Sequence, residues 1–327
     1  MITPTPSGTR DMLPDEMREL RAISDRLRAA FEGAGYGEVW TPTVEYEEVL
    51  ERGDQRAAGA GLRLFDGSGR VLVLRFDMTI PIARLVGARY RDAAVPIRLS
   101  YFAHSYRAVS RGQVQAREFL QAGIELIGAP GPEGEAEVVA LVIEALSQAG
   151  LEEHRVGIGD GDLYRSLLAD CGVLEKDRMP LLETLARRDL VGLGAQLSDL
   201  GIDGADLELL TSLPTMRGPA EILDRVDPRA GRAVENLRAL NALLNKRGVG
   251  DRVLFDLGLV RELGYYSGAV FEVYDPAVGY AIGGGGRYDK LLGRFGRDLP
   301  ACGIALDLQR IHAAGAAEER LDRESSK

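Results

Sequence analysis

Apolar residues recur at helical spacing in two long stretches of this chain. Between Pro14 and Ala34 they return every third or fourth position, which predicts an amphipathic helix. Pro14 suits the first turn of that helix, and the glycines at 33 and 35 favour its end. A second such helix is predicted from Glu133 to Ala149, closed by Gly150, and a short helix is predicted to follow residues 79–81.

Shorter apolar runs, several with alternating polar positions, predict strands. One is expected at 71–76, and two more, at 95–102 and 118–127, form a hairpin-like unit. A short strand is expected at 155–158. Further strands are expected at 253–257, 269–274 and 280–283, and the segment 301–311 is typical of a strand that leads into a helix.

The middle of the chain has a different character. From about residue 161 to 247 leucine-rich and charge-rich helical patterns dominate, which predicts a helical insertion. The main domain is then formed by residues 1–160 and 248–312, and residues 313–327 are expected to form a flexible tail because they contain few apolar anchors. Strands without regular alternation with helices indicate the α+β class, with a mixed, mostly antiparallel sheet and flanking helices.

Composition narrows the class of protein. The 327 residues carry a net charge of −10, which is weak evidence against a nucleic-acid-binding protein. No apolar run is long enough to span a bilayer and the first residues lack a signal peptide, so we expect a cytoplasmic protein without membrane association. Two cysteines make no disulfide framework, and three dispersed histidines lack ligand spacing, so no metal site is expected.

The residues best suited to bind a small molecule lie in the segment 259–272, Leu-Val-Arg-Glu-Leu-Gly-Tyr-Tyr-Ser-Gly-Ala-Val-Phe-Glu. A glycine-rich turn is expected after it at 283–289, Gly-Gly-Gly-Gly-Arg-Tyr-Asp. The arginine, Arg261, can form a fork onto an α-carboxylate. The tyrosines Tyr265 and Tyr266 offer a flat wall and hydroxyl groups. The glycines lack P-loop spacing, so close approach of the backbone to a ligand or strand is expected rather than a phosphate cradle.

These two segments resemble the histidine-recognition signature of histidyl-tRNA synthetases, which are class II aminoacyl-tRNA synthetases. The resemblance extends from about residue 6 to 311 and implies a class II synthetase-like fold. It also implies that Arg261 pairs with the histidine carboxylate, while Tyr265 and Tyr266 form the ring wall and hydrogen-bond the imidazole. A plain alternative is an exposed arginine followed by two tyrosines that only pack.

Two further segments extend the resemblance. Leu-Arg-Phe-Asp-Met-Thr, 74–79, lies where synthetases carry the glutamate and threonine that hold the substrate's amino group, which assigns Asp77 and Thr79 to that role. Gln-Ala-Gly-Ile-Glu, 121–125, places Gln121 and Glu125 on one strand face. A buried Glu125 needs a partner, for which an imidazole N–H is suitable. Alternatively, both residues merely line a solvated face.

The nucleotide motifs depart from the synthetase pattern. Arg107 matches the motif 2 arginine that binds the ATP α-phosphate, and Arg310 matches the motif 3 arginine that contacts the γ-phosphate. However, Val109 replaces the acidic residue that reads adenine, and Gln309 replaces a glutamate. Glu262 and Gly264 also replace a glycine and an aspartate of the signature. Arg107 and Arg310 are therefore candidates for vestigial nucleotide or anion contacts, or for plain surface arginines.

The Arg-Phe-Asp-Met-Thr stretch is closer to the synthetase-like regulatory subunits of ATP phosphoribosyltransferase, the first enzyme of histidine biosynthesis. This resemblance implies a non-catalytic subunit with L-histidine as regulatory ligand, no cofactor, and a short-form catalytic subunit as partner. Class II motif 1, at 36–42, implies a homodimer within a larger hetero-oligomer; local packing of its proline is the alternative. The sequence ends soon after motif 3, where synthetases continue into an anticodon-binding domain, so tRNA charging is not expected. A histidine-activating, ATP-dependent enzyme of the synthetase type remains the alternative function.

Overall fold

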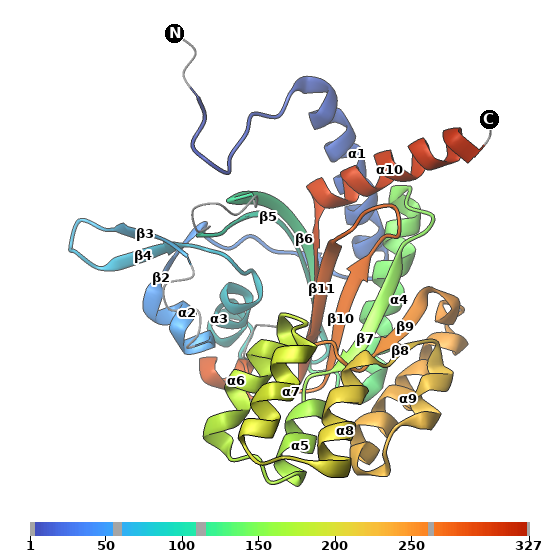
Figure 1. Cartoon of the computed structure of the whole chain (residues 1–327). Coiled ribbons are helices and arrows are strands. Elements are labelled where there is room, and N and C mark those ends of the chain that lie inside the picture. Colours follow the sequence, from blue (N-terminus) through green and yellow to red (C-terminus); the bar gives the residue numbers. More distant parts are fainter. Residues whose placement is uncertain (1–3, 55–60, 109–115, 261–264, 326–327) are drawn as a thin grey trace.

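A computed structural model describes residues 4–54, 61–108, 116–260 and 265–325 (Figure 1). In these ranges, the centre of the molecule is a nine-stranded sheet of order β1-β5-β6-β12-β11-β10-β7-β9-β8. In that order the strands are Gly37–Glu38, Ile97–Tyr106, Glu118–Ile127, Ala301–Asp307, Ala281–Arg287, Ala269–Tyr274, Arg155–Asp160, Val253–Asp256 and Arg217–Gly218. All neighbours pair antiparallel except β1 with β5 and β7 with β9. The predicted mixed, mostly antiparallel sheet is thus confirmed.

Three long helices cover one face of this sheet: α1 (Pro14–Gly33), α4 (Gly131–Ala149) and α10 (Leu308–Ser325). Helix α1 contacts both α4 and α10, and α4 lies against β6, β12 and β7. Leu27 and Phe31 of α1 are fully buried, as the helical spacing of apolar residues predicted. Gly150 ends α4 in the left-handed conformation, with φ 101°, which glycine adopts without steric cost.

The opposite face carries shorter elements. Helices α2 (Glu47–Gly53) and α3 (Thr79–Arg89) pack on each other, and η6 (Leu292–Phe295) packs on α3. A small antiparallel sheet lies beside them, formed by β2 (Val44–Tyr46), β4 (Val71–Leu74) and β3 (Leu62–Phe65). Arg75, just after β4, is buried and donates to the carbonyls of Thr41, Pro42 and His104, which ties the motif 1 segment to β5.

The segment 161–247 is mostly helical, and the short strand β8 lies among its helices. It contains α5 (Leu163–Asp170), α6 (Glu175–Ala186), α7 (Leu190–Asp199), α8 (Gly204–Ser212), η2 (Leu213–Thr215), η3 (Ala220–Arg225), η4 (Pro228–Ala230) and α9 (Gly231–Lys246). A further turn, η5 (Gly250–Arg252), leads back into β9. Buried leucines on α5 to α9 join the same apolar core as the sheet, and α9 packs on α4 (Figure 1). No described helix is long and apolar enough to cross a membrane.

Two segments differ from their expected form. The glycine run 283–286 is not a turn but lies inside β11, between β10 and β12. A β-carbon on Gly285 would lie only 1.9 Å from the carbonyl oxygen of Gly303, so the close approach of the two strands requires glycine. The segment expected as a flexible tail continues α10 to Ser325, because Ala314 and Ala317 are buried and Glu318 accepts the N–H groups of Glu152 and Glu153.

Candidate functional site

Asp77 and Tyr265 meet on the face of the sheet opposite α1 and α4, although 188 positions separate them in the chain. The Tyr265 hydroxyl donates to Asp77 Oδ2 at 2.7 Å, and the Ile80 N–H donates to Oδ1 at 2.8 Å in the first turn of α3. Both side chains are buried. Burial raises the pKa of Asp77, and the two hydrogen bonds only partly oppose it. The carboxyl group therefore favours a ligand that brings positive charge or a hydrogen-bond donor.

Glu125 on β6 is the second buried carboxyl group, with only 1% of its surface exposed. The Thr79 hydroxyl donates to Oε1 at 2.8 Å, and the Tyr288 hydroxyl donates to Oε2. Burial raises the pKa of Glu125 to about 8, against the lowering effect of these two hydroxyl groups and with a further rise from nearby Asp77. The structure thus excludes the interpretation that Glu125 lies on a solvated strand face.

Aromatic rings surround the two carboxyl groups. The ring centroids of Tyr265 and Tyr266 lie 4.9 Å apart, and Tyr288 meets Tyr265 edge-on at 5.8 Å. Tyr101, on β5, is fully buried, and its register opposite Gly123 brings its hydroxyl close to that glycine, between the expected positions Gln121 and Glu125.

Sequence reasoning missed Tyr101 and Tyr288 as members of this site. Tyr288 had a signal, because it belongs to the Gly-Gly-Arg-Tyr-Asp stretch. For Tyr101 the sequence gives no signal beyond its place on a predicted strand, because only the β5–β6 register brings it opposite Gly123.

Glycines give the site its space. A β-carbon on Gly303 would lie 1.8 Å from Glu125 Oε2, and one on Gly123 would lie 2.3 Å from the Tyr101 hydroxyl. A β-carbon on Gly286 would meet the Tyr266 ring at 2.8 Å. These glycines let the Glu125 carboxylate and the rings of Tyr101 and Tyr266 come close to the backbone of the sheet, where any side chain would displace them.

An ion pair beneath the site holds the tyrosine-bearing segments in place. Arg287 and Glu135 are both buried, and Arg287 Nε lies 2.6 Å from Glu135 Oε1, which joins β11 to α4. Ser267 donates its N–H to the Arg287 carbonyl and accepts the N–H of Asp289 on its hydroxyl. Tyr266 and Tyr288 are therefore positioned by neighbours that are bonded to each other.

The structure brings together Asp77, Thr79, Glu125, Tyr265 and Tyr266 of the residues predicted to bind histidine. Gln121 lies farther along β6, where the Ser105 hydroxyl donates to its Oε1 at 2.9 Å. Arg261 lies outside the described residues, as do Val109, Glu262 and Gly264.

Arg107 and Arg310 gather near one carboxylate, Asp307. Arg310 Nε lies 3.4 Å from Asp307 Oδ2 and its Nη1 donates to the Ala281 carbonyl at 2.6 Å. The Arg107 guanidinium stacks 4.2 Å from the Phe119 ring centroid. Burial raises the pKa of Asp307, and the charges of both arginines oppose that effect. The negative charge of Asp307 partly neutralises the two arginines, so they attract an anion less strongly than two unpaired arginines would.

Chemically, the Asp77–Glu125 cluster is suited to recognition. Two carboxyl groups with raised pKa values, set among tyrosine rings, can accept hydrogen bonds from an ammonium and from a ring N–H of one small molecule. The aromatic walls can pack on a flat ring. A small amino acid with a planar, N–H-bearing side chain matches this arrangement.

Comparison with known proteins gives a consistent family assignment. The family model described as histidyl-tRNA synthetase matches residues 8–311. ATP phosphoribosyltransferase regulatory subunits are similar to this chain: that of Symbiobacterium thermophilum is 41% identical over 98% of this chain and 83% of its own length, and that of Desulfitobacterium hafniense is 40% identical over 94% and 80%.

Solved structures agree with this assignment. A Bacillus halodurans protein titled ATP phosphoribosyltransferase regulatory subunit/histidyl-tRNA synthetase superposes with a TM-score of 0.88 at 34% identity, covering 96% of this chain and 83% of its own. A histidyl-tRNA synthetase from Nostoc, 22% identical, shares the fold with a TM-score of 0.79 over 96% of this chain and 75% of its own. The chain belongs to the histidyl-tRNA synthetase-like family of ATP phosphoribosyltransferase regulatory subunits, with the class II synthetase fold.

Proposed function

We propose that this chain binds L-histidine and regulates ATP phosphoribosyltransferase, the first enzyme of histidine biosynthesis, without catalysing a reaction itself. The observation that carries the proposal is the buried pair of Asp77 and Glu125, both bonded to tyrosine hydroxyls, in a member of the regulatory-subunit family. The pair supplies acceptors for the two N–H-bearing ends of histidine. Regulation follows because occupancy of this site depends on the concentration of histidine.

Each part of histidine has a partner in this proposal. Asp77, with Thr79 beside it, accepts the α-ammonium group, and Glu125 accepts an imidazole N–H. Tyr265 and Tyr266 pack against the imidazole ring. Arg261 pairs with the carboxylate, and Gln121 lies at the edge of the site. Thr79 and Glu125 already share a hydrogen bond of 2.8 Å, so the ammonium and imidazole contacts are coupled.

Feedback follows from differential affinity. A ligand shifts an assembly between two states only by as much as its affinities for them differ. A coupling of about 1–3 kcal/mol between the histidine site and the partner is typical of allosteric proteins. Histidine, the end product of the pathway, then lowers the activity of a bound short-form catalytic subunit in the cytoplasm.

Assembly is proposed to use the motif 1 edge. Strand β1 lies at the end of the large sheet, and Trp40, which follows it, has 79% of its surface exposed. Large exposed aromatic residues at a sheet edge are typical of protein interfaces. We propose that this edge forms a homodimer inside the hetero-oligomer with the catalytic subunit.

Co-purification with a short-form catalytic subunit tests the function, followed by phosphoribosyltransferase assays with and without histidine. We expect full activity only in the complex, and inhibition by histidine. Asp77→Asn should abolish inhibition while the complex still forms. Asp66→Asn is the matched control, because Asp66 caps an exposed turn through the N–H groups of Ser68 and Arg70. An assembly whose activity ignores histidine contradicts the regulatory proposal.

The alternative is a histidine-activating enzyme that uses ATP. Arg107 and Arg310, near each other at Asp307, are the observation in its favour. Histidine-dependent exchange of pyrophosphate into ATP distinguishes the two functions. Exchange above background that Arg310→Gln removes would replace the regulatory proposal with this one.

A further inference from the structure

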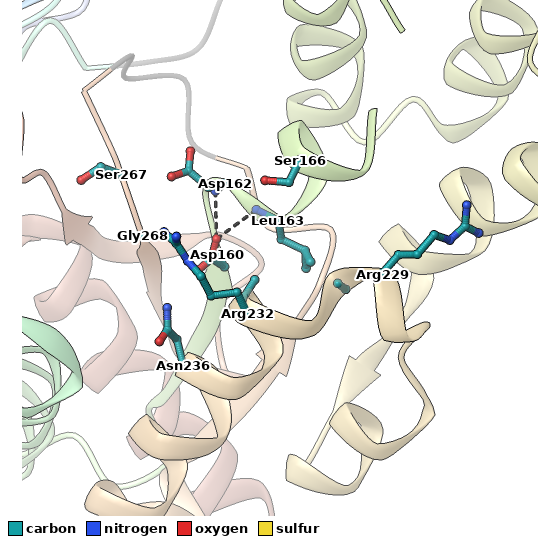
Figure 2. A pocket seen from close by; sticks show the side chains of 11 residues that line it. Asp160, Asp162, Leu163, Ser166, Arg229, Arg232, Asn236, Ser267 and Gly268 are labelled. Carbon is teal, nitrogen blue, oxygen red and sulfur yellow. Dashed lines mark hydrogen bonds between the residues drawn. The ribbon is translucent and has the colours of Figure 1, made fainter. Parts of the chain in front are cut away.

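A cavity of about 290 Å³ lies between the end of β7 and the helical insertion (Figure 2). Its volume is close to the lower end of the range for small-molecule sites. Polar residues from β7, α5, α9 and the segment after Tyr266 line it, among them Asp160, Asp162, Ser166, Arg232, Asn236 and Ser267. The histidine-site residues Asp77, Glu125 and Tyr265 are not among the lining residues, so this is a separate place in the fold.

Asp160 forms the floor of the cavity, with only 7% of its surface exposed. Its Oδ1 accepts the N–H groups of Asp162 and Leu163, both at 2.9 Å, and so caps the start of α5 (Figure 2). Its Oδ2 has no hydrogen bond among the described residues. Because the carboxylate already occupies the amino end of α5, the helix offers little to an anion there, and the floor favours a cation.

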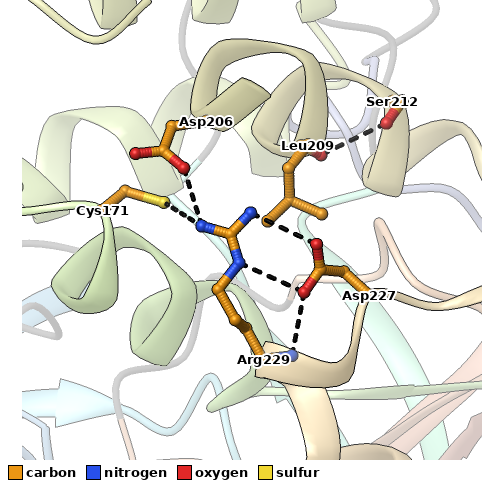
Figure 3. A network of polar contacts seen from close by, with 6 residues as sticks. All are labelled: Cys171, Asp206, Leu209, Ser212, Asp227 and Arg229. Carbon is orange, nitrogen blue, oxygen red and sulfur yellow. Dashed lines mark hydrogen bonds and ion pairs between the residues drawn. The ribbon is translucent and has the colours of Figure 1, made fainter. Parts of the chain in front are cut away.

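Arg232 supplies the opposite charge. Its exposed side chain reaches from α9 toward Asp160 without forming an ion pair within the described part of the chain (Figure 2). The other arginine of the cavity wall, Arg229, extends away toward Asp206 and Asp227, with nitrogen–oxygen distances of 2.7 and 3.1 Å (Figure 3). The cavity thus presents a buried carboxylate at its floor and a guanidinium at its rim.

We propose that this cavity binds a small zwitterion of the α-amino-acid type, with its ammonium on Asp160 and its carboxylate on Arg232. A buried carboxylate that forms no ion pair favours an ammonium, and a guanidinium matches a carboxylate in geometry. Asn236, Ser166 and Ser267 supply amide and hydroxyl groups for a polar side chain. The proposal does not depend on histidine binding at Asp77 and Glu125.

The cavity is connected to the histidine site through one backbone segment. The Gly161 N–H, next to Asp160, donates to the Gly268 carbonyl at 2.8 Å, and a β-carbon at Gly161 would lie 3.7 Å from the Tyr266 β-carbon. A molecule that contacts Ser267 and Gly268 therefore touches the segment that positions Tyr266. The two sites can influence each other's affinity through this contact.

Saturation-transfer NMR on the full-length chain tests the proposal, in an Asp77→Asn background that removes the other ammonium acceptor. The probes are the proteinogenic amino acids, each compared with its decarboxylated amine and with its α-hydroxy acid. We expect at least one amino acid to bind and both analogues to bind at least about tenfold more weakly, since each lacks one charge-assisted contact.

Two variants complete the test. Arg232→Gln, an exposed substitution, and Asp160→Asn, which keeps a capping oxygen, should each weaken binding by at least about tenfold. Lys246→Gln is the matched control, because it removes one positive charge from the same helix away from the cavity and should change nothing. The proposal is overturned if no amino acid binds, if an amine binds as tightly as its amino acid, or if Arg232→Gln leaves binding unchanged.

Discussion

The raised pKa of Glu125 predicts an unusual effect of replacing it with glutamine. Glutamine keeps the size of the side chain and can still accept from Thr79 and contact Tyr288, but it carries no charge at any pH. In the folded wild type, burial raises the pKa of Glu125 to about 8, while its ordinary value is 4.5. Folding therefore binds a proton at neutral pH, and Glu125→Gln removes that requirement.

The size of the effect follows from linkage. A raised carboxyl pKa contributes stability that is fully present below the unfolded value of 4.5 and is lost as the pH rises through about 8. Each pH unit above 4.5 lowers the free energy of unfolding by about 1.4 kcal/mol, so at pH 7 the wild type has lost about 3 kcal/mol of this contribution. The stability of Glu125→Gln relative to wild type should therefore increase by about that amount between pH 4.5 and 7.

Urea unfolding at a series of pH values between 5 and 8, with both proteins free of ligand, measures this difference. Glu137→Gln is the control. Burial acts to raise the pKa of Glu137, but Arg98 and Tyr36 outweigh it and lower that pKa, so the variant should be destabilised by a constant amount over this range. A Glu125→Gln difference that does not grow with pH would refute the claim that Glu125 is protonated in the folded state.

The same substitution should weaken the proposed function. Glutamine offers the imidazole N–H a neutral acceptor in place of a carboxylate, and hydrogen bonds to charged groups contribute about 1.5–3 kcal/mol. Titration calorimetry at pH 8 should therefore show histidine affinity reduced at least about tenfold. A more stable protein with unchanged histidine affinity would mean that Glu125 serves the fold and does not contact the ligand.

Three further substitutions test the packing around the site. Arg75→Met should cost about 3 kcal/mol or more in urea unfolding, because three backbone carbonyls lose the donor that the buried Arg75 side chain provides. The exposed ion-pair residue Arg63 should tolerate methionine within about 0.5 kcal/mol, and equal effects of the two substitutions would contradict this view. Gly285→Ala should prevent soluble expression or lower the free energy of unfolding by more than about 3 kcal/mol, because its β-carbon would collide with the backbone of Gly303. Gly67→Ala is the control and should have neither effect, because Gly67 lies in open space. A well-folded Gly285→Ala protein would show that β11 and β12 can separate. Tyr288→Phe removes a donor that lowers the pKa of Glu125, so the pKa of Glu125 in the folded variant should be higher than in the wild type. The stability of the variant should therefore continue to fall with rising pH beyond the point where that of the wild type levels off. Levelling off at a lower pH than in the wild type would contradict the assigned hydrogen bond.

Much of the fold could be predicted from the sequence because its signals are local. Helical spacing identified α1 and α4, and alternation identified the β5–β6 hairpin with Gln121 and Glu125 on one face. The glycine run was harder, because glycines are equally typical of turns and of tightly packed strands. Only the pairing of β11 with β12 decided between these two forms.

The sequence by itself determined the family, the element pattern and most of the residues with binding chemistry, since side-chain type and period are properties of the chain alone. The tertiary structure decided which of them meet. Tyr265 reaches Asp77, Tyr288 reaches Glu125, and Arg232 faces Asp160, each across long separations in sequence. Burial then raises the pKa values of these carboxyl groups, and burial depends on what packs over a residue rather than on its neighbours in the sequence.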